Sequence, residues 1–219
     1  MDWWDAEIDR RHGYTVATLA EAPDLTQVWR RQLKLGVRKL LAKRYDEAAE
    51  ALEEVVLEDP RLEKAWFHLG RALSGRGDAV GAAEAFERAA ELDPVDPRYP
   101  LMAGNAWSSA ERHPAALDAF DRARRIALEG DDPGQAATAV FNMGNTWYRL
   151  DDLEEAVASY ELAIELDETY DRAREYRDIV MEIMEERRSE EGVDPDQSED
   201  AAGRPARSEE NTPSERPTP

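Results

Sequence analysis

The chain has 219 residues, a formal net charge of −21, six tryptophans and no cysteine. The lack of cysteine excludes a disulfide framework and a thiol nucleophile, and the acidic excess argues against a nucleic-acid partner, because binding phosphates requires basic residues. No apolar run reaches the roughly eighteen residues that span a membrane, and the first residues do not resemble a signal peptide. We therefore expect a cytoplasmic protein that does not bind membranes, with enough apolar residues for one elongated domain.

Residues 1–28 precede the regular part of the sequence. Apolar spacing predicts two short helices here, one carrying Trp3 and Trp4 and ending at Gly13, the other ending before Pro23. Two interpretations stay open for this N-terminal helical extension. It is either a cap over the exposed end of the following repeats, or a tryptophan anchor that enters a groove of this chain or of a partner.

Residues 63–96 predict a pair of short helices. Residues 74–78 have the composition of a tight turn, and Pro94 ends the second helix. Apolar residues recur every three or four positions, which places them on one face of each helix. These residues are Trp66, Leu69, Gly70 and Leu73 in the first helix, and Ala82, Phe86 and Ala89 in the second.

This pattern recurs with a period of 34 residues. A shift by one period aligns Gly36, Gly70 and Gly104, and Gly144 joins them after an insertion around residues 129–134. The sequence therefore predicts four repeats, at about 29–62, 63–96, 97–130 and 137–170. We expect the insertion to form a lengthened surface loop. Because a glycine inside a helix costs about 1 kcal/mol relative to alanine, we expect each aligned glycine to permit close helix packing.

The second repeat resembles the tetratricopeptide repeat (TPR) family. The family's pattern of aromatic, Leu-Gly, small and proline positions is complete in Trp66, Leu69, Gly70, Leu73, Ala82, Phe86, Ala89 and Pro94. The other repeats depart from it in places, with Gln32 or Pro100 at the first aromatic position and Glu168 in place of the proline. The resemblance implies an all-α, right-handed α-solenoid of four helix hairpins that binds other proteins.

Two further segments follow the repeats. Residues 170–188 carry one apolar stripe on a helix of Glu and Arg, which predicts a capping helix at the end of the solenoid. From residue 189 to 219 the chain is rich in Ser, Glu, Asp and Pro, and we expect a disordered acidic tail.

The sequence shows no pattern typical of an enzyme. The three histidines lack metal-ligand spacing, and Gly75-Arg76-Gly77 lies in a predicted turn between helices rather than after a strand. Acidic pairs such as Glu53-Glu54 lie on solvated helix faces. We therefore predict no catalytic residue, no cofactor and no metal ion.

Charge divides unevenly between the two helices of each predicted hairpin. First helices carry almost no acids, whereas second helices carry many. In a TPR-like arrangement the first helices line the concave face, so the resemblance implies a basic-to-neutral groove in an acidic molecule. The inner positions that it implies are Leu33, Val37, Lys64, Phe67, Arg71, Arg98, Leu101, Asn105, Phe141, Asn142, Asn145 and Tyr148.

These inner residues suggest a peptide ligand. Phe67, Leu101 and Phe141 are apolar residues that hairpin packing is not expected to require, and the asparagines supply donors and acceptors for a peptide backbone. We expect a segment with acidic and apolar residues. The alternative is that this face meets only water or the chain's own N-terminus. Recognition of a chaperone's C-terminal carboxylate is disfavoured, because Leu101 and Tyr176 stand where that subfamily has basic residues.

The sequence therefore predicts a non-catalytic interaction module, such as an adaptor, scaffold or assembly factor. The alternative is a homo-oligomeric structural protein that uses the N-terminal tryptophans or an end repeat as its interface. The acidic composition, with four Lys and 24 Arg, has two explanations. It reflects either a high-salt cytoplasm, as in a halophile, or a functional acidic outer face.

Overall fold

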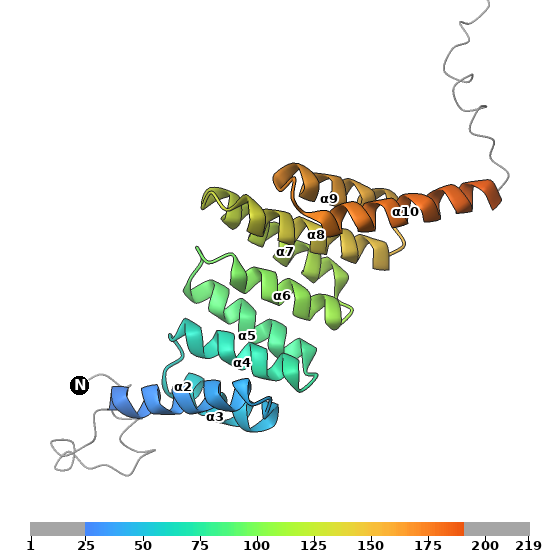
Figure 1. The fold of residues 1–219 in the computed structure, drawn as a ribbon. Helices are drawn as coiled ribbons and strands as arrows, with labels where there is room; N and C mark the ends of the chain where they lie inside the picture. Colours follow the sequence, from blue (N-terminus) through green and yellow to red (C-terminus); the bar gives the residue numbers. More distant parts are fainter. Residues whose placement is uncertain (1–24, 191–219) are drawn as a thin grey trace, which may run out of the picture.

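The computed structural model describes residues 25–190, which form nine helices and no strand (Figure 1). The predicted all-α solenoid is confirmed, whereas the helices expected before residue 25 and most of the acidic tail lie outside the described residues. The helices are α2 (Leu25–Leu41), α3 (Tyr45–Glu58), α4 (Glu63–Gly75), α5 (Ala79–Leu92), α6 (Arg98–Ser109), α7 (His113–Glu129), α8 (Pro133–Arg149), α9 (Leu153–Leu166) and α10 (Asp171–Glu190).

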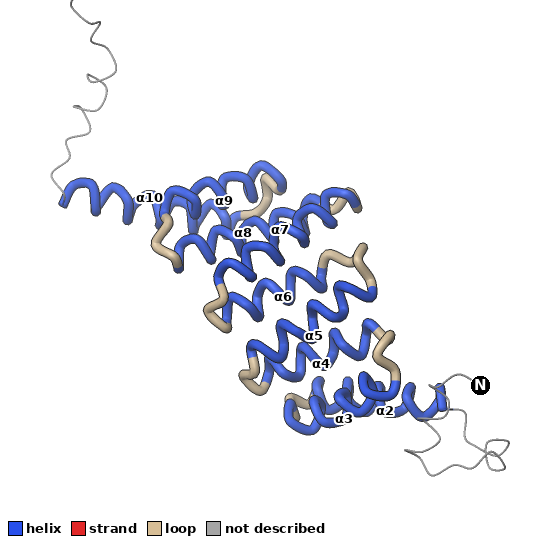
Figure 2. The backbone as a smooth tube through the Cα atoms, turned by 180° about the vertical axis from the view of Figure 1, so that it is seen from behind, coloured by secondary structure: helices blue, strands red, loops and turns tan. Residues whose placement is uncertain are grey.

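Successive helices pair into four hairpins that stack in chain order, as both views of the backbone show (Figures 1 and 2). Each helix packs against the next one along the chain, from α2 to α10. Two pairs of neighbouring first helices also touch, α2 against α4 and α6 against α8, and no pair of neighbouring second helices makes comparable contact. At these two places the array is tighter on the side of the first helices, which we call its inner face.

The aligned glycines let the two helices of each hairpin approach closely. A Cβ atom on Gly104 would lie 2.5 Å from the ring of Phe120, and one on Gly70 would lie 2.7 Å from the ring of Phe86. Gly36 and Gly144 face Leu52 and Tyr160 in the same way. The expected packing role is confirmed, since the space of each missing side chain is filled by a large side chain of the partner helix.

The turns inside the hairpins share one backbone conformation. Lys43, Gly77, Glu111 and Asp151 occupy the same turn position, and all four have φ between 58° and 91°. Only Gly77 adopts this left-handed conformation without steric cost.

The insertion at residues 129–134 is not a lengthened loop, and this prediction was wrong. Helix α7 continues to Glu129 and α8 begins at Pro133, so the connection has only three residues, and Asp131 repeats the left-handed turn with φ 55°. The Asp132 side chain accepts a hydrogen bond from the Gln135 backbone N–H, and Pro133 occupies the first turn. These strong helix-start signals turn the extra residues into additional helix.

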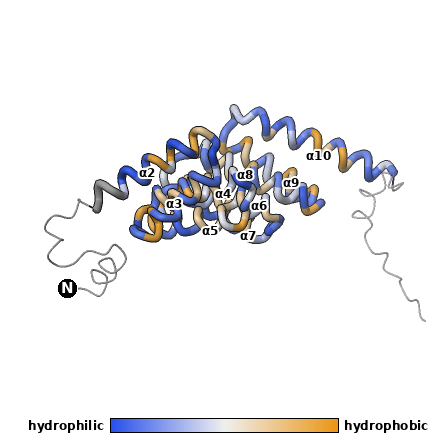
Figure 3. Tube along the Cα trace, turned by 90° about the horizontal axis from the view of Figure 1, so that it is seen from below, coloured by the Kyte–Doolittle hydropathy of each residue, from blue (hydrophilic) through white to orange (hydrophobic). Residues whose placement is uncertain are grey.

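Helix α10 closes the far end of the array with one apolar stripe on a largely hydrophilic helix (Figure 3). Ala173 and Val180 are buried against the last hairpin, whereas Tyr176 and Ile179 of the same stripe are exposed. The guanidinium of Arg187 pairs with Asp151 at 2.8 Å and ties the helix to the turn between α8 and α9. The helix ends at Glu190, two residues beyond the expected limit.

Candidate functional site: a cavity on the inner face

The inner face is poor in acidic residues. Helices α2, α6 and α8 contain no Asp or Glu, and α4 contains only Glu63. Second helices hold the acids instead, as α3 shows with Asp46 and Glu47 in its first turn. The expected division of charge thus follows the geometry of the solenoid.

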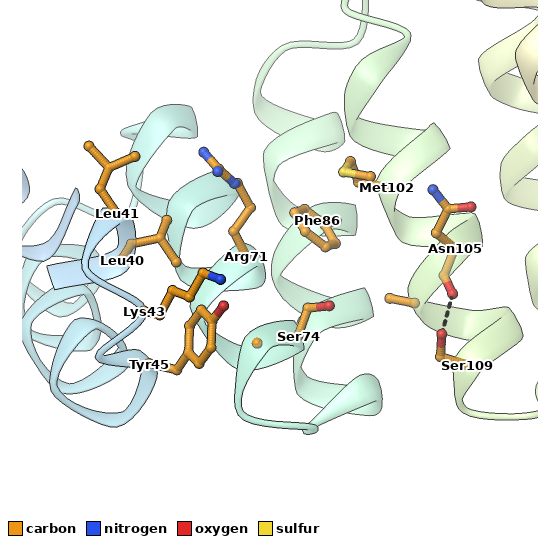
Figure 4. A pocket seen from close by; sticks show the side chains of 12 residues that line it. Leu40, Leu41, Lys43, Tyr45, Arg71, Ser74, Phe86, Met102, Asn105 and Ser109 are labelled. Atoms are coloured by element: carbon orange, nitrogen blue, oxygen red, sulfur yellow. Dashed lines mark hydrogen bonds between the residues drawn. The ribbon is translucent and has the colours of Figure 1, made fainter. Parts of the chain in front are cut away.

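A cavity of about 450 Å³ opens among α2, α4 and α6. Its cations are Lys43 and Arg71, and none of its lining residues is acidic. Apolar and small polar side chains complete the wall. Figure 4 shows Leu40, Leu41, Lys43 and Tyr45 on one side, Met102, Asn105 and Ser109 on the other, and Arg71 and Ser74 between them. The cavity can hold an apolar side chain beside an anionic group.

Arg71 is positioned by an aromatic cluster. Its guanidinium carbon lies 5.8 Å from the ring centroid of Phe67, within the range of a cation–π contact. The Phe67 ring in turn packs against Tyr99 of α6 at 5.4 Å and Phe86 of α5 at 5.8 Å. Burial, with a further contribution from the charge of Arg71, lowers the pKa of the neighbouring His68. Arg71 is therefore an exposed cation whose side chain is supported by packed aromatic rings.

The three predicted asparagines are already engaged in hydrogen bonds. Asn142 Nδ2 donates to Asn105 Oδ1 at 3.1 Å, which links α8 to α6 across the inner face. Asn145 Oδ1 accepts from the Tyr160 hydroxyl at 3.0 Å. Asn105 also lines the cavity, so its remaining amide protons are the ones placed to meet a ligand there.

Lys64 and Arg98 are exposed but paired with acids. The Arg98 side chain donates from Nε to both carboxylate oxygens of Asp96, at 2.9 and 3.0 Å. This side-chain hydrogen bond is the main reason that the pKa of Asp96 lies below its ordinary value. Lys64 lies 3.9 Å from Glu63. Of the three predicted basic contacts, Arg71 is the one that lines the cavity.

Phe141 requires a correction, because it is a core residue. It is 2% exposed and packs against Tyr160, Tyr170 and Tyr176 at 5.2–5.5 Å between ring centroids. The statement that hairpin packing does not require this ring was wrong, because Tyr160 of the partner helix α9 packs against it. Tyr170, just before α10, and Tyr176 of α10 add two rings from outside the repeat pattern. Arg172 lies over the Phe141 ring at 5.1 Å.

The remaining predicted residues have mixed exposure. Tyr148 is 45% exposed, whereas Leu33, Val37 and Leu101 are half-buried.

Sequence reasoning missed most of the cavity wall. Leu41 is 73% exposed at the end of α2, and Lys43 and Tyr45 follow in the turn and the start of α3. Lys43 and Tyr45 lie outside the first helices, and Leu41 is the last residue of α2, beyond the inner positions that the resemblance implied. The Tyr45 ring fills the space beside Gly75 of the next hairpin, 2.3 Å from where a Cβ atom would lie, and this contact between hairpins is visible only in the structure.

A second cavity of about 390 Å³ shares Ser109 with the first and lies at the ends of α6 and α8, beside the turn that leads to α7. Ser108, His113 and Arg149 line it, and Arg149 Nη1 donates to the Ser108 hydroxyl at 2.8 Å. Glu111 is its single carboxylate. Together the two cavities extend the candidate surface from α2 to α8.

The described residues contain no group of three or more His, Asp or Glu placed to hold a metal ion. Within residues 25–190 no helix has the length and apolarity required to cross a membrane.

The four stacked helix hairpins, with a cavity on their inner face, define a helical-hairpin repeat protein. Sequence models of the tetratricopeptide repeat match residues 39–105 and 137–170. These residues of the chain are therefore tetratricopeptide repeats. A search of curated protein sequences gave no match.

Solved structures share the fold at low sequence identity. MamA superposes with a TM-score of 0.59 at 22% identity, over 67% of this chain and 82% of MamA. A T3SS complex from Aeromonas hydrophila gives a TM-score of 0.55 at 20% identity, over 67% of this chain and 97% of that one. PcrH bound to the chaperone binding region of PopD gives 0.53 at 20% identity, over 57% and 96%. At this identity the likeness establishes the architecture alone.

Proposed function

We propose that this protein is a non-catalytic interaction module, an adaptor, scaffold or assembly factor that holds a peptide segment of a partner on its inner face. The observation that carries the proposal is the cavity among α2, α4 and α6. In a chain of net charge −21 its wall contains Lys43 and Arg71 and no carboxylate. Such a wall favours a partner segment with an apolar anchor next to an acidic residue. PcrH, which has the same fold, was solved with a segment of a partner protein.

The proposal is tested with selected peptides. A displayed library of random peptides is screened against the full chain, and fluorescence anisotropy gives the affinity of the enriched sequences. We expect enrichment of peptides that combine acidic and large apolar residues. In the Lys43→Gln/Arg71→Gln variant, affinity falls at least about tenfold, or about 1.4 kcal/mol, and depends less on salt.

The matched control removes two exposed cations away from the cavity, in Arg61→Gln/Arg188→Gln. Equal loss in both variants would show that only net charge matters. No loss in the cavity variant would disprove the proposed site. Arg98, with its Asp96 partner, is a weaker target than the sequence suggested.

Self-assembly is the competing function, and one observation favours it. The last hairpin and α10 expose Leu162, Ile179 and Met181, each at 40–46%. Light scattering over a hundredfold concentration range distinguishes the two functions, because self-assembly predicts a mass that rises with concentration. The N-terminal tryptophans proposed for the same role lie outside the described residues.

A further inference from the structure

The first helix of the array carries charges at positions that every later first helix buries. The repeat alignment places Ala65, Tyr99, Ala139 and Ala173 at the position of Arg31. At the position of Arg38 it places Ala72, Ala106, Thr146 and Val180. Each of these eight residues is at most 5% exposed. These residues lie where a hairpin or α10 stacks on the preceding hairpin. Arg31 and Arg38 are exposed because no hairpin among the described residues precedes α2.

Lys34 lies between them on the same side of α2, and we name Arg31, Lys34 and Arg38 the basic end face. The three cations are spaced by three and four residues, so they are neighbours on the helix surface. All three are exposed, and none forms an ion pair with another described residue. Like charges at this spacing destabilise a helix, and burying them under another hairpin would cost more still. The face therefore favours an anionic segment over a further repeat.

We propose that the basic end face binds the acidic segment Met1–Asp9 of the same chain. This segment contains four carboxylates, of Asp2, Asp5, Glu7 and Asp9, and no Lys or Arg. Arginine forms its strongest hydrogen bonds with carboxylates in paired geometry. Trp3 and Trp4 add indole rings, the best cation–π partners for a guanidinium.

The tether has the right length for this contact. From Leu25 to Arg38 the helix rises about 20 Å at 1.5 Å per residue. The fifteen residues between Asp9 and Leu25 reach at most about 50 Å, at roughly 3.3–3.6 Å per residue, which exceeds this distance. A contact within one chain is therefore sterically possible, and the covalent link raises the effective concentration of the segment at the face.

The cysteine-free sequence makes the test direct, because one introduced thiol can be labelled specifically. In the full-length Ala6→Cys variant with a nitroxide label, we measure paramagnetic broadening of backbone amide signals by NMR. We expect amides of residues 31–38 to lose more than about half of their intensity at low salt, and to regain it at 1 M NaCl, where the screening length is about 3 Å. Broadening disappears in Arg31→Glu/Arg38→Glu and persists in the control Arg61→Glu/Arg188→Glu.

A charge swap keeps the test independent of any general damage to α2. Adding Asp5→Arg/Asp9→Arg to the Arg31→Glu/Arg38→Glu variant restores the broadening if the segment and the face pair directly. Broadening centred on Arg71 and Asn105 would place the segment in the cavity and overturn the proposal. Broadening that appears only when labelled and unlabelled molecules are mixed would assign the contact to a second copy. Absence of broadening throughout the protein would show that the segment does not bind the basic end face.

Discussion

Single glycines set the distance between helices in this solenoid. At Gly104 an added Cβ would lie 2.5 Å from a ring that is itself 1% exposed, so neither side has room to move. The four aligned glycines therefore lower the helix propensity of their helices but permit dense packing between them.

We predict that Gly104→Ala destabilises the protein by about 1–3 kcal/mol through overpacking against Phe120. Urea denaturation followed by circular dichroism measures the change. The control Gly134→Ala, whose Cβ would meet only Asp132 Oδ1 at 3.7 Å, should be neutral or stabilising by up to about 1 kcal/mol. Equal behaviour of the two variants would contradict the packing role.

Glu111 shows a local strain that the repeat does not require. Its φ of 59° is the left-handed conformation that Gly77 adopts at the same turn position. Glu111→Gly should therefore raise the melting temperature, although the gain is reduced by the entropy of glycine in the unfolded chain. The reverse change, Gly77→Ala, should lower it. A lower melting temperature for both variants would show that φ does not control stability at this position.

Tyr160 makes stability depend on pH in the alkaline range. Burial, with smaller effects of Tyr176 and Tyr148, raises the pKa of Tyr160 to about 12 from an ordinary value of 10.0. A folded-state pKa above the unfolded value means that the stabilisation is complete below pH 10 and is lost as the pH rises through about 12. Tyr160→Phe should lose less stability than wild type between these pH values in urea titrations. Parallel losses would exclude Tyr160 as the source.

At the scale of elements, helix-start signals determined that the inserted residues form helix rather than a long loop. The sequence around residues 129–134 contains Gly, Asp and Pro, which are typical of loops. In the fold the same residues cap and start α8, so Asp132 and Pro133 extend a helix instead of interrupting the array.

We predict that Asp132→Ala lowers the melting temperature, because it removes the acceptor for the Gln135 N–H. Asp132→Asn should retain most of the stability, since asparagine is an equally good N-cap. The hydrogen bond from the Gln135 backbone also lowers the pKa of Asp132, so its contribution is lost as the pH falls through that lowered value. If alanine and asparagine behave alike, the cap does not stabilise α8.

At the scale of the whole molecule, the charge is distributed by face. Acids lie on the second helices, whereas the inner face is poor in acids and α2 and the cavity carry exposed cations. We predict that the urea midpoint rises between low salt and 1 M NaCl, as screening relieves repulsion among the carboxylates. A constant midpoint would count against a high-salt environment and favour a specific function of the outer face.

The sequence alone determined the architecture, because a repeat requires each hairpin to bury the same residues against its neighbours. Gly36, Gly70, Gly104 and Gly144 gave the period, and their packing could be predicted from the cost of glycine in a helix. The lack of acids in first helices was equally visible in the sequence. Inner positions such as Arg71 and Asn105, which the TPR resemblance implied, line the cavity.

Only the tertiary structure decided which of those residues are available to a ligand. Phe141 is covered by rings from α9 and α10, Arg98 is held by Asp96, and the asparagines bond to one another or to Tyr160, since such contacts depend on three-dimensional neighbours outside the repeat. The cavity itself combines the end of α2 with α4 and α6, and a spacing rule for one helix cannot place residues of three helices around a common space.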